Sequence, residues 1–447
     1  MKKIWKFLLD NSLLLVIGAV IALIWAQCGE AANHVYHSIL HWHLPFMDNS
    51  LFGSDAFQYE LDDAGNRIMV MLDEHGKVLL NENGQKVILD TPIKHFDIHY
   101  FINDFLMAFF FMSAGKEVFE ATFPGGALHN PKQAATPLIA TAGGVLGPIC
   151  VFCLMGIFLG PLFGYHWTPL TPTDQFALSH GWAVPTATDI AFSAMIARII
   201  FGGRHPAVPF LLLLAIADDA VGLVIIAVFF GSGFGVNTII GLAGTVVCML
   251  IGYFLFNKKL KWNSWVPYFI LMLISWGCFG YAGIHTSLGF IPIVVCMPHA
   301  AEDDGVHSDD ERGKEDALNK LQTAFYVPTE IILGLFGWAS AGVAFTTIGF
   351  PTACVALALI IGKMVGIFVF GGISGKLLGL PGGMSYKDLL VLGSAAGIGF
   401  TVALFVAGVA FPEGETKDAA KLGALLSLCS MFVAYGLAKI CKVERKA

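Results

Sequence analysis

Two adjacent acidic residues lie in the middle of a long apolar stretch of this 447-residue chain. Asp218 and Asp219 are the only charged residues in positions 208–230, a stretch long enough to cross a bilayer as a helix. Even on lenient insertion scales, an ionised carboxylate at mid-membrane depth costs roughly 2.5 to 3.5 kcal/mol, so two of them need a cation, a proton or a fixed positive partner. The pair therefore predicts an ion site.

Two further charged residues stand alone in apolar stretches. Asp189 is the only charge in residues 182–197, and Lys363 is the only charge in residues 349–375. Ionised groups at this depth face the interior of a helix bundle and find partners there. We therefore expect both residues to meet the aspartate pair in one core, with a purely structural polar network as the alternative.

The chemistry of such a pair is competition between protons and small cations. Neighbouring residues of a helix point about 100° apart, so one carboxylate can face a cavity while the other reaches a neighbour. Burial disfavours the ionised form of each group, and the charge of one disfavours ionisation of the other. Protons and sodium then compete for the same oxygens, and acid should stop sodium binding.

The composition is that of a polytopic membrane protein. The chain is 56% hydrophobic and 13% charged, whereas about a quarter of the residues of a soluble domain are charged. Its 50 glycines and 37 phenylalanines fit close helix contacts and a lipid-facing surface. The nine cysteines show no disulfide or zinc spacing, and we interpret them as packing residues. We expect membrane lipid around the chain, no cofactor and no nucleic-acid partner.

We expect about twelve spans in a single transmembrane domain formed by residues 1–447. With about 20 residues per span, the apolar segments are 7–27, 98–119, 134–160, 181–200, 207–231, 236–256, 264–282, 284–298, 323–346, 350–375, 388–411 and 419–440. The first segment imitates a secretory signal, but we expect it to be retained because it lacks a good cleavage site and is long enough to span. Lysines and arginines then gather on one side, which places both termini in the cytoplasm.

One segment does not fit the membrane pattern. Between residues 50 and 92 the chain alternates short strand-like runs with turn sequences, which predicts a small β-rich hairpin insertion on the extracytoplasmic face. The runs cover residues 57–61, 67–72, 77–80 and 86–89. Open strand edges could pair with a second copy and hold a homodimer, although a solvated hairpin without a partner is the alternative. Residues 300–322 are predicted to form a polar, partly helical cytoplasmic loop.

Two spans carry helix-breaking sequences near their middle. Pro185 and two threonines precede Asp189, and residues 396–401 read Ala-Gly-Ile-Gly-Phe-Thr. Free backbone groups at mid-membrane are tolerated only where protein walls a cavity. The two spans are the middle members of spans 3–5 and spans 10–12, which run in opposite directions across the membrane. This pattern is typical of an inverted-repeat transporter whose site lies where two discontinuous helices cross.

Several short strings resemble the NhaA-type sodium/proton antiporter family, over most of the chain from about residue 103 onward. The strings include Phe101-Ile102-Asn103-Asp104, Gly115-Lys116-Glu117-Val118, Gly181-Trp182-Ala183-Val184-Pro185, Ala187-Thr188-Asp189-Ile190-Ala191-Phe192, Ala217-Asp218-Asp219, Gly283-Ile284-His285, Ala341-Gly342-Val343, Ile361-Gly362-Lys363 and Gly397-Ile398-Gly399-Phe400-Thr401. A lone pair of aspartates would be weak support, whereas these strings in this order are specific.

The resemblance implies an all-α antiporter of the bacterial inner membrane that exchanges cytoplasmic sodium or lithium for external protons by alternating access. It implies that Asp218 and Asp219 bind the ions and that Thr188 and Asp189 lie at a helix break. Lys363 has two interpretations. Together with Asp189 it offsets the charged ends of the broken helices, or it pairs with Asp218 and sheds a proton when sodium arrives. The family also implies electrogenic, pH-regulated exchange that serves sodium and pH homeostasis.

Part of the chain departs from the family pattern. Phe119 and Glu120 replace a basic pair, and the histidines common before the ninth span are missing. We therefore expect exchange with an altered pH profile. Glu117 could still line a cytoplasmic mouth, and a salt bridge with Lys116 or Lys132 is an equal alternative.

Four histidines need separate interpretations. His34, His37 and His41 could line one helix face as a metal site, but no carboxylate or cysteine completes the set, so we interpret them as interfacial residues. His285 could respond to pH or be a hydrogen-bonded packing residue.

Two other functions share some of these features. A sodium-coupled solute symporter would need an organic-substrate pocket, for which the sequence offers no clear residues. An intramembrane aspartyl protease would draw its aspartates from different helices, one of them in a Gly-x-Gly-Asp string that is absent here. The prediction is therefore a transporter and not an enzyme.

Overall fold

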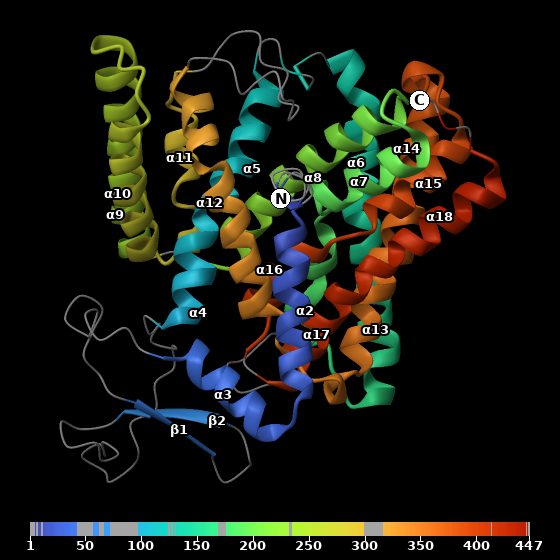
Figure 1. Ribbon diagram of the computed structural model, residues 1–447, viewed down its shortest axis with the longest axis horizontal. Coiled ribbons are helices and arrows are strands. Elements are labelled where there is room, and N and C mark those ends of the chain that lie inside the picture. Colours follow the sequence, from blue (N-terminus) through green and yellow to red (C-terminus); the bar gives the residue numbers. More distant parts are fainter. Residues whose placement is uncertain are drawn as a thin grey trace.

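The computed structural model describes residues 5, 8, 9, 12–42, 57–61, 67–71, 97–123, 126, 128, 129, 131–168, 176–231, 235–298, 316–412, 414–443 and 445. In this part of the chain nearly all elements are helices, which pack into a bundle with two short strands at one end (Figure 1).

The α-helices follow one another along the chain with short interruptions. The first half contains α2 (Leu13–Gln27), α3 (Glu30–Leu40), α4 (Ile98–Tyr100), α5 (Met107–Thr122), α6 (Pro131–Leu154), α7 (Ile190–Phe201), α8 (Ala207–Phe229) and α9 (Val236–Leu250). The second half contains α10 (Val266–Ala282), α11 (Ile291–Val294), α12 (Ala317–Ser340), α13 (Phe350–Leu357), α14 (Lys363–Leu378), α15 (Tyr386–Ala396), α16 (Phe400–Ala410), α17 (Glu415–Leu426) and α18 (Ser430–Cys441).

Segments of other helical types extend or join these helices. The π-helical segments are η2 (Phe101–Leu106), η3 (Met155–Leu159), η6 (Ile251–Lys259) and η10 (Ala358–Gly362). The 3-10 segments are η4 (Gly160–Phe163), η5 (Ser179–Thr186), η7 (Thr286–Leu288), η9 (Phe345–Thr347), η11 (Pro381–Gly383) and η12 (Ser427–Cys429).

Long apolar helices bear out the predicted all-α membrane fold. Among the described residues, five helical stretches are long and apolar enough to cross a membrane, and the number rises to seven if each of two bent helix pairs counts as one span. The five stretches are Ala134–Phe163, Ala207–Phe229, Val236–Lys259, Phe350–Leu378 and Glu415–Cys441. The total of about twelve spans stays a prediction.

The two bent pairs lie where the sequence predicts interruptions. The axes of η5 and α7 are bent by 44° relative to each other, and those of α15 and α16 by 48°. In the first pair, Pro185 offers no N–H to continue the helix. Asp189 then adopts an extended backbone and caps α7, because its carboxylate accepts the N–H of Phe192.

Glycines shape the second break and bring it against the first. A Cβ on Gly399 would lie 2.7 Å from the side chain of Leu359, so a larger residue would force the neighbour to move. The backbone N–H of Asp189 donates to the carbonyl of Ile398 over 2.7 Å. The two interruptions are therefore joined directly, backbone to backbone.

Two segments differ from the expected spans. Residues 284–298 form only the short helices η7 and α11, because Gly289 packs against the backbone of Trp276 and Pro292 starts a new helical turn. Helix α12 begins at Ala317, inside the predicted loop 300–322, because the carboxylate of Asp316 caps it. Residues 300–315 of that loop lie outside the described part of the chain.

The two strands lie within the predicted insertion. β1 (Phe57–Leu61) and β2 (Arg67–Met71) pair antiparallel, with Phe57 opposite Met71. The predicted strands at 77–80 and 86–89 lie outside the described residues. The insertion at 50–92 as a whole therefore remains a prediction.

Helices α6 and α14 contact each other through glycines. A Cβ on Gly147 would lie 2.9 Å from the Cα of Gly366, and a Cβ on Gly362 would lie 2.7 Å from the Cα of Pro148. Small residues allow this backbone contact between helices in lipid. Lys363 lies between the two glycines of its own helix, so the contact fixes where its backbone sits.

Gly366→Ala is expected to destabilise the protein, because the added Cβ would collide with the carbonyl oxygen of Gly143. Overpacking of this kind costs about 1 to 3 kcal/mol. Gly277→Ala in α10 is the matched control, since a Cβ there meets nothing within 4 Å. Thermal unfolding of the detergent-purified variants measures both. Equal stability of the two would show that the glycine contact is dispensable.

Candidate functional site

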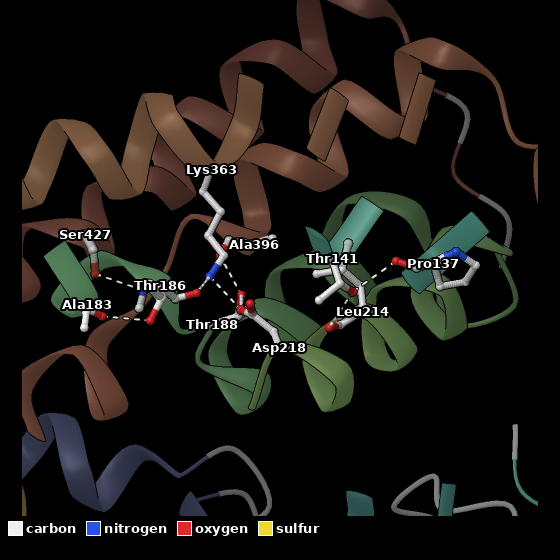
Figure 2. A network of polar contacts seen from close by, with 11 residues as sticks. Pro137, Thr141, Ala183, Thr186, Thr188, Leu214, Asp218, Lys363, Ala396 and Ser427 are labelled. Atoms are coloured by element: carbon white, nitrogen blue, oxygen red, sulfur yellow. Dashed lines mark hydrogen bonds and ion pairs between the residues drawn. The ribbon is translucent and has the colours of Figure 1, made fainter. Parts of the chain in front are cut away.

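The aspartate pair lies at the middle of α8 and is buried, with Asp218 1% and Asp219 8% exposed. The Oδ2 atom of Asp218 accepts a hydrogen bond from Lys363 Nζ at 2.6 Å and another from Thr188 Oγ1 at 2.7 Å (Figure 2). These partners come from α14 and from the break between η5 and α7. The structure therefore brings three predicted site residues together.

Lys363 is fully buried at the start of α14, directly after the π-helical turn η10. Its Nζ also donates to the carbonyl oxygen of Thr186 at 2.6 Å (Figure 2). Thr186 is the last residue of η5, and carbonyls at the end of a helix carry partial negative charge. One ammonium group thus binds a carboxylate and the negative end of a broken helix.

Asp189 lies at the opposite kind of helix end. One carboxylate oxygen accepts the N–H of Phe192 at 3.2 Å in the first turn of α7. The other accepts the N–H of Thr401 at 3.2 Å and the Thr401 hydroxyl, in the first turn of α16. Helix N-termini carry partial positive charge. Asp189 therefore neutralises the positive ends of both broken helices.

Asp219 has no comparable fixed counter-charge among the described residues. Its Oδ1 atom, like that of Asp218, is buried there without a hydrogen-bond donor. The charges of Asp218, Glu117 and Asp189 repel it, and the attracting Lys363 is already bound to Asp218. A buried, unpaired carboxylate is strongly disfavoured. Asp219 therefore needs a proton or a cation that arrives from outside the core.

The two unpartnered carboxylate oxygens suit a small hard cation, because such ions prefer oxygen ligands. Within the described part of the chain, no group of three or more histidine, cysteine or acidic residues could hold a metal ion. What the pair offers is two oxygens that either a proton or a cation can occupy.

Glu117 is half-buried on α5, and its charge acts on Asp219. The neighbouring Lys116 is buried and pairs with Glu120, with 2.6 Å between Nζ and Oε2. Lys116 thus forms an ion pair with Glu120, one turn later on the same helix, while the pairing of Glu117 weighed from the sequence stays a prediction. The side chain of Lys132 lies outside the described part of the structure.

His285 belongs to a second polar cluster. It is buried between α10 and η7, with Nδ1 2.8 Å from the hydroxyl of Ser287 and 3.8 Å from Oδ1 of Asp104. Thr286 Oγ1 donates to the same Asp104 oxygen at 2.8 Å. The packed, hydrogen-bonded interpretation of His285 thus fits, and its pH response stays a prediction.

One of the three histidines in and directly after α3 contacts a carboxylate that the sequence analysis did not assign to this set. The rings of His37 and His41 stack with 6.3 Å between centroids. Nδ1 of His41 lies 2.8 Å from Oδ2 of Asp97, which directly precedes α4. This pair ties α3 to the start of the next helical segment.

Sequence reasoning missed two residues that hold the second break. The sequence analysis named Thr401 only within the helix-breaking run 396–401 and gave it no role of its own. In the structure, its N–H and hydroxyl both donate to Asp189. Ser427 accepts the N–H of Gly399 at 3.2 Å and donates to the carbonyl of Ala424 at 2.6 Å. A hydroxyl residue two positions after the second breaking glycine, in the first turn of the next helix, could have revealed Thr401. Nothing around position 427 marks the serine in the same way.

Comparison with known proteins gives a consistent result over the whole chain. The sequence model of the family described as Na+/H+ antiporter 1 matches residues 79–437. The chain is 40% identical to the Na(+)/H(+) antiporter NhaA of Jannaschia sp. (strain CCS1), over 100% of both proteins. It is 35% identical to the NhaA of Desulfitobacterium hafniense (strain DSM 10664 / DCB-2), over 99% of this chain and 97% of that one.

A third relative is the Na(+)/H(+) antiporter NhaA of Geobacter metallireducens (strain ATCC 53774 / DSM 7210 / GS-15), which is 39% identical over 82% of this chain and 92% of its own length. The matched residues include both broken helices, the aspartate pair and the lysine that binds it. On the strength of that coverage and identity, this multi-pass membrane protein belongs to the Na+/H+ antiporter 1 family.

Proposed function

We propose that this protein exchanges cytoplasmic sodium or lithium for external protons across the bacterial inner membrane, as a secondary antiporter. The observation that supports this most is the unequal pairing of two neighbouring buried aspartates. Asp218 has an ion pair with Lys363, whereas Asp219 has a buried oxygen without a donor and several like charges around it. The names of the relatives supply the class of the two exchanged ions.

Exchange follows if only neutralised forms of the site can move. With both aspartates ionised, the core has more negative charge than Lys363 can balance, and moving such a core through the apolar bundle is unfavourable. Protons or sodium remove that excess. The loaded states can then rock between the two faces while the empty state cannot, which couples inward protons to outward sodium.

Charge balance and pH dependence follow from the same competition. If more protons enter than sodium charges leave, the exchange is electrogenic. Acid slows the exchange, because protons then hold the oxygens that sodium needs.

Two residues outside the aspartate pair are proposed to modulate the exchange. Glu117, whose charge acts on Asp219, is proposed to line the cytoplasmic mouth, and His285 is proposed to contribute to the pH response. Phe119 and Glu120 stand where the family often has a basic pair, and Glu120 pairs with Lys116, so the pH profile is proposed to differ.

Both roles of Lys363 are compatible with its contacts. Its bond to the Thr186 carbonyl supports compensation of a helix end, together with Asp189 at the N-terminal ends of α7 and α16. Its bond to Asp218 supports the alternative, in which sodium displaces the ammonium and the lysine sheds a proton.

The proposed architecture places this site at the crossing of two inverted repeats. Spans 3–5 contain α6 to α8, spans 10–12 contain α13 to α18, and a bent helix pair lies in the middle of each triplet. About twelve spans with both termini in the cytoplasm complete the proposal. The insertion at 50–92 is proposed to hold a homodimer on the extracytoplasmic side.

Asp218→Asn and Asp219→Asn are each expected to abolish exchange, because an amide cannot bind and release a proton at this position. In everted vesicles with an imposed pH gradient, sodium should dissipate the gradient with the native protein and not with these variants. Asp316→Asn is the control, since asparagine also caps α12 and position 316 precedes the helix. Native activity in both site variants would remove the mechanism.

Thr401→Val is expected to slow exchange because it removes the hydroxyl that binds Asp189 while keeping the shape of the side chain. A hydrogen bond to a charged group contributes about 1.5 to 3 kcal/mol, so the rate should fall roughly tenfold or more. Thr401→Ser should restore most of it. Rates per amount of protein in the same vesicles measure this, and equal behaviour of the valine and serine variants would contradict a role for the hydroxyl.

Deletion of residues 50–92 is expected to convert the dimer into a monomer while exchange in vesicles persists, since the ion site lies outside this segment. Light scattering of the detergent-purified protein measures the mass. An unchanged dimeric mass would refute the proposed contact.

A further inference from the structure

One buried hydroxyl near the ion site takes no part in the hydrogen bonds that surround the aspartate pair. Ser193 lies near the start of α7, where its backbone N–H donates to the carbonyl of Asp189 at 3.0 Å. Its side chain is fully buried, and its Oγ atom has no hydrogen-bond partner among the described residues. Hydroxyls within helices often donate to the carbonyl one turn earlier, as Thr141 does to Pro137. The hydroxyl of Ser193 makes no such bond, so it can bind something else.

The register of three helices places Ser193 at the level of the pair between Asp218 and Lys363. One buried apolar cluster takes a residue from each helix: Ala197 of α7, Leu214 of α8 and Ile367 of α14. Asp218 and Lys363 each lie one turn from this cluster, and their side chains bond at 2.6 Å (Figure 2). Ser193 also lies one turn from it, in the direction of Thr188, which bonds to Asp218.

The side chain of Ser193 also faces the correct side. Residues four apart lie on one face of a helix, so Ser193 shares its face of α7 with Ala197. That face packs against α8 and α14 through the apolar cluster. The hydroxyl of Ser193 is therefore directed toward the helices that carry Asp218 and Lys363.

A small cation at this level would need more oxygens than the two aspartates leave unpartnered. Those are the Oδ1 atoms of Asp218 and Asp219. Hard cations such as Mg²⁺ and Ca²⁺ take about six or more oxygen ligands. A serine hydroxyl is a neutral acceptor with two lone pairs. It adds a ligand without adding to the like charges that already repel Asp219.

We propose that the hydroxyl of Ser193 is a further ligand of the sodium or lithium ion held by Asp218 and Asp219. The inference rests on the proposed exchange function and deepens it. Unlike the carboxylates, a serine hydroxyl has no ionisation to offer in the pH range of the exchange. Ser193 therefore strengthens the binding of the cation and leaves the binding of protons unchanged.

One other buried serine provides a matched control. Ser275 on α10 is also fully buried, and its Oγ atom has no hydrogen-bond partner among the described residues. Its helix packs against α9 and α11 and contributes no residue to the pair between Asp218 and Lys363. Ser275→Ala thus deletes a comparable hydroxyl at a distance from the ion site.

The test is the sodium dependence of exchange in everted vesicles, measured as KM and maximal rate at one fixed pH. Ser193→Ala should raise the KM for sodium several-fold with little change in maximal rate, whereas Ser275→Ala should keep the native KM. Ser193→Cys should behave like alanine, because sulfur is a poor ligand for small hard cations. Ser193→Thr keeps the hydroxyl and should restore most of the affinity.

Calorimetry of the purified full-length variants adds a measurement that a packing defect would not reproduce. Sodium should bind more weakly to Ser193→Ala, while the number of protons released per bound sodium stays that of the native protein. The reason is that this substitution leaves every titratable group in place.

The outcomes separate the ligand from the function. If the native protein exchanges sodium for protons and Ser193→Ala keeps the native KM, the inference is overturned. A lower maximal rate with an unchanged KM would also contradict it, because that result indicates a packing role. If the native protein shows no sodium-dependent exchange, the proposed function itself fails. If Ser193→Ala does not fold, Ser193→Cys keeps the side-chain volume and decides the question by the same KM.

Discussion

The buried ion pair between Lys363 and Asp218 determines what the neighbouring aspartate can do. The single ammonium group of Lys363 is bound by Asp218 and by the carbonyl of Thr186. A second carboxylate, adjacent in sequence and also buried, must then obtain positive charge from elsewhere. In a membrane core, protons and small ions are the charges that arrive and leave. Because buried ion pairs contribute little to stability compared with apolar packing, this arrangement fits a transport role better than a structural one.

The broken helices create the electrostatic surroundings of that pair. Asp189 joins the N-terminal ends of α7 and α16, and Lys363 meets the C-terminal end of η5, so three helix ends at the breaks have an opposite charge beside them. At the C-terminal end of α15, the hydroxyl of Thr188 donates to the carbonyl of Ala396. The glycine contact between α6 and α14 holds the backbone of Lys363 close to the breaks.

The charged residues of the core and both helix breaks could be predicted because buried charge and interrupted helices are unfavourable wherever they occur. Their hydrogen-bond partners could not, since the roles of Thr401 and Ser427 depend on which helix lies opposite. The pair between Lys116 and Glu120 has the i, i+4 spacing that favours ion pairs on a helix, so the sequence alone could have predicted it. The division of residues 284–298 into two short helical segments could not be predicted, because a count of apolar residues does not register a glycine packed against a neighbouring backbone.

Sodium binding to the purified protein, measured by titration calorimetry in buffers with different heats of ionisation and at several pH values, tests the central claim most directly. If sodium and protons exclude each other from the aspartate pair, binding releases protons and the sodium affinity falls with decreasing pH, by up to about tenfold per unit for each competing proton. Sodium that binds with the same affinity at every pH, without proton release, would show that the two ions occupy separate places.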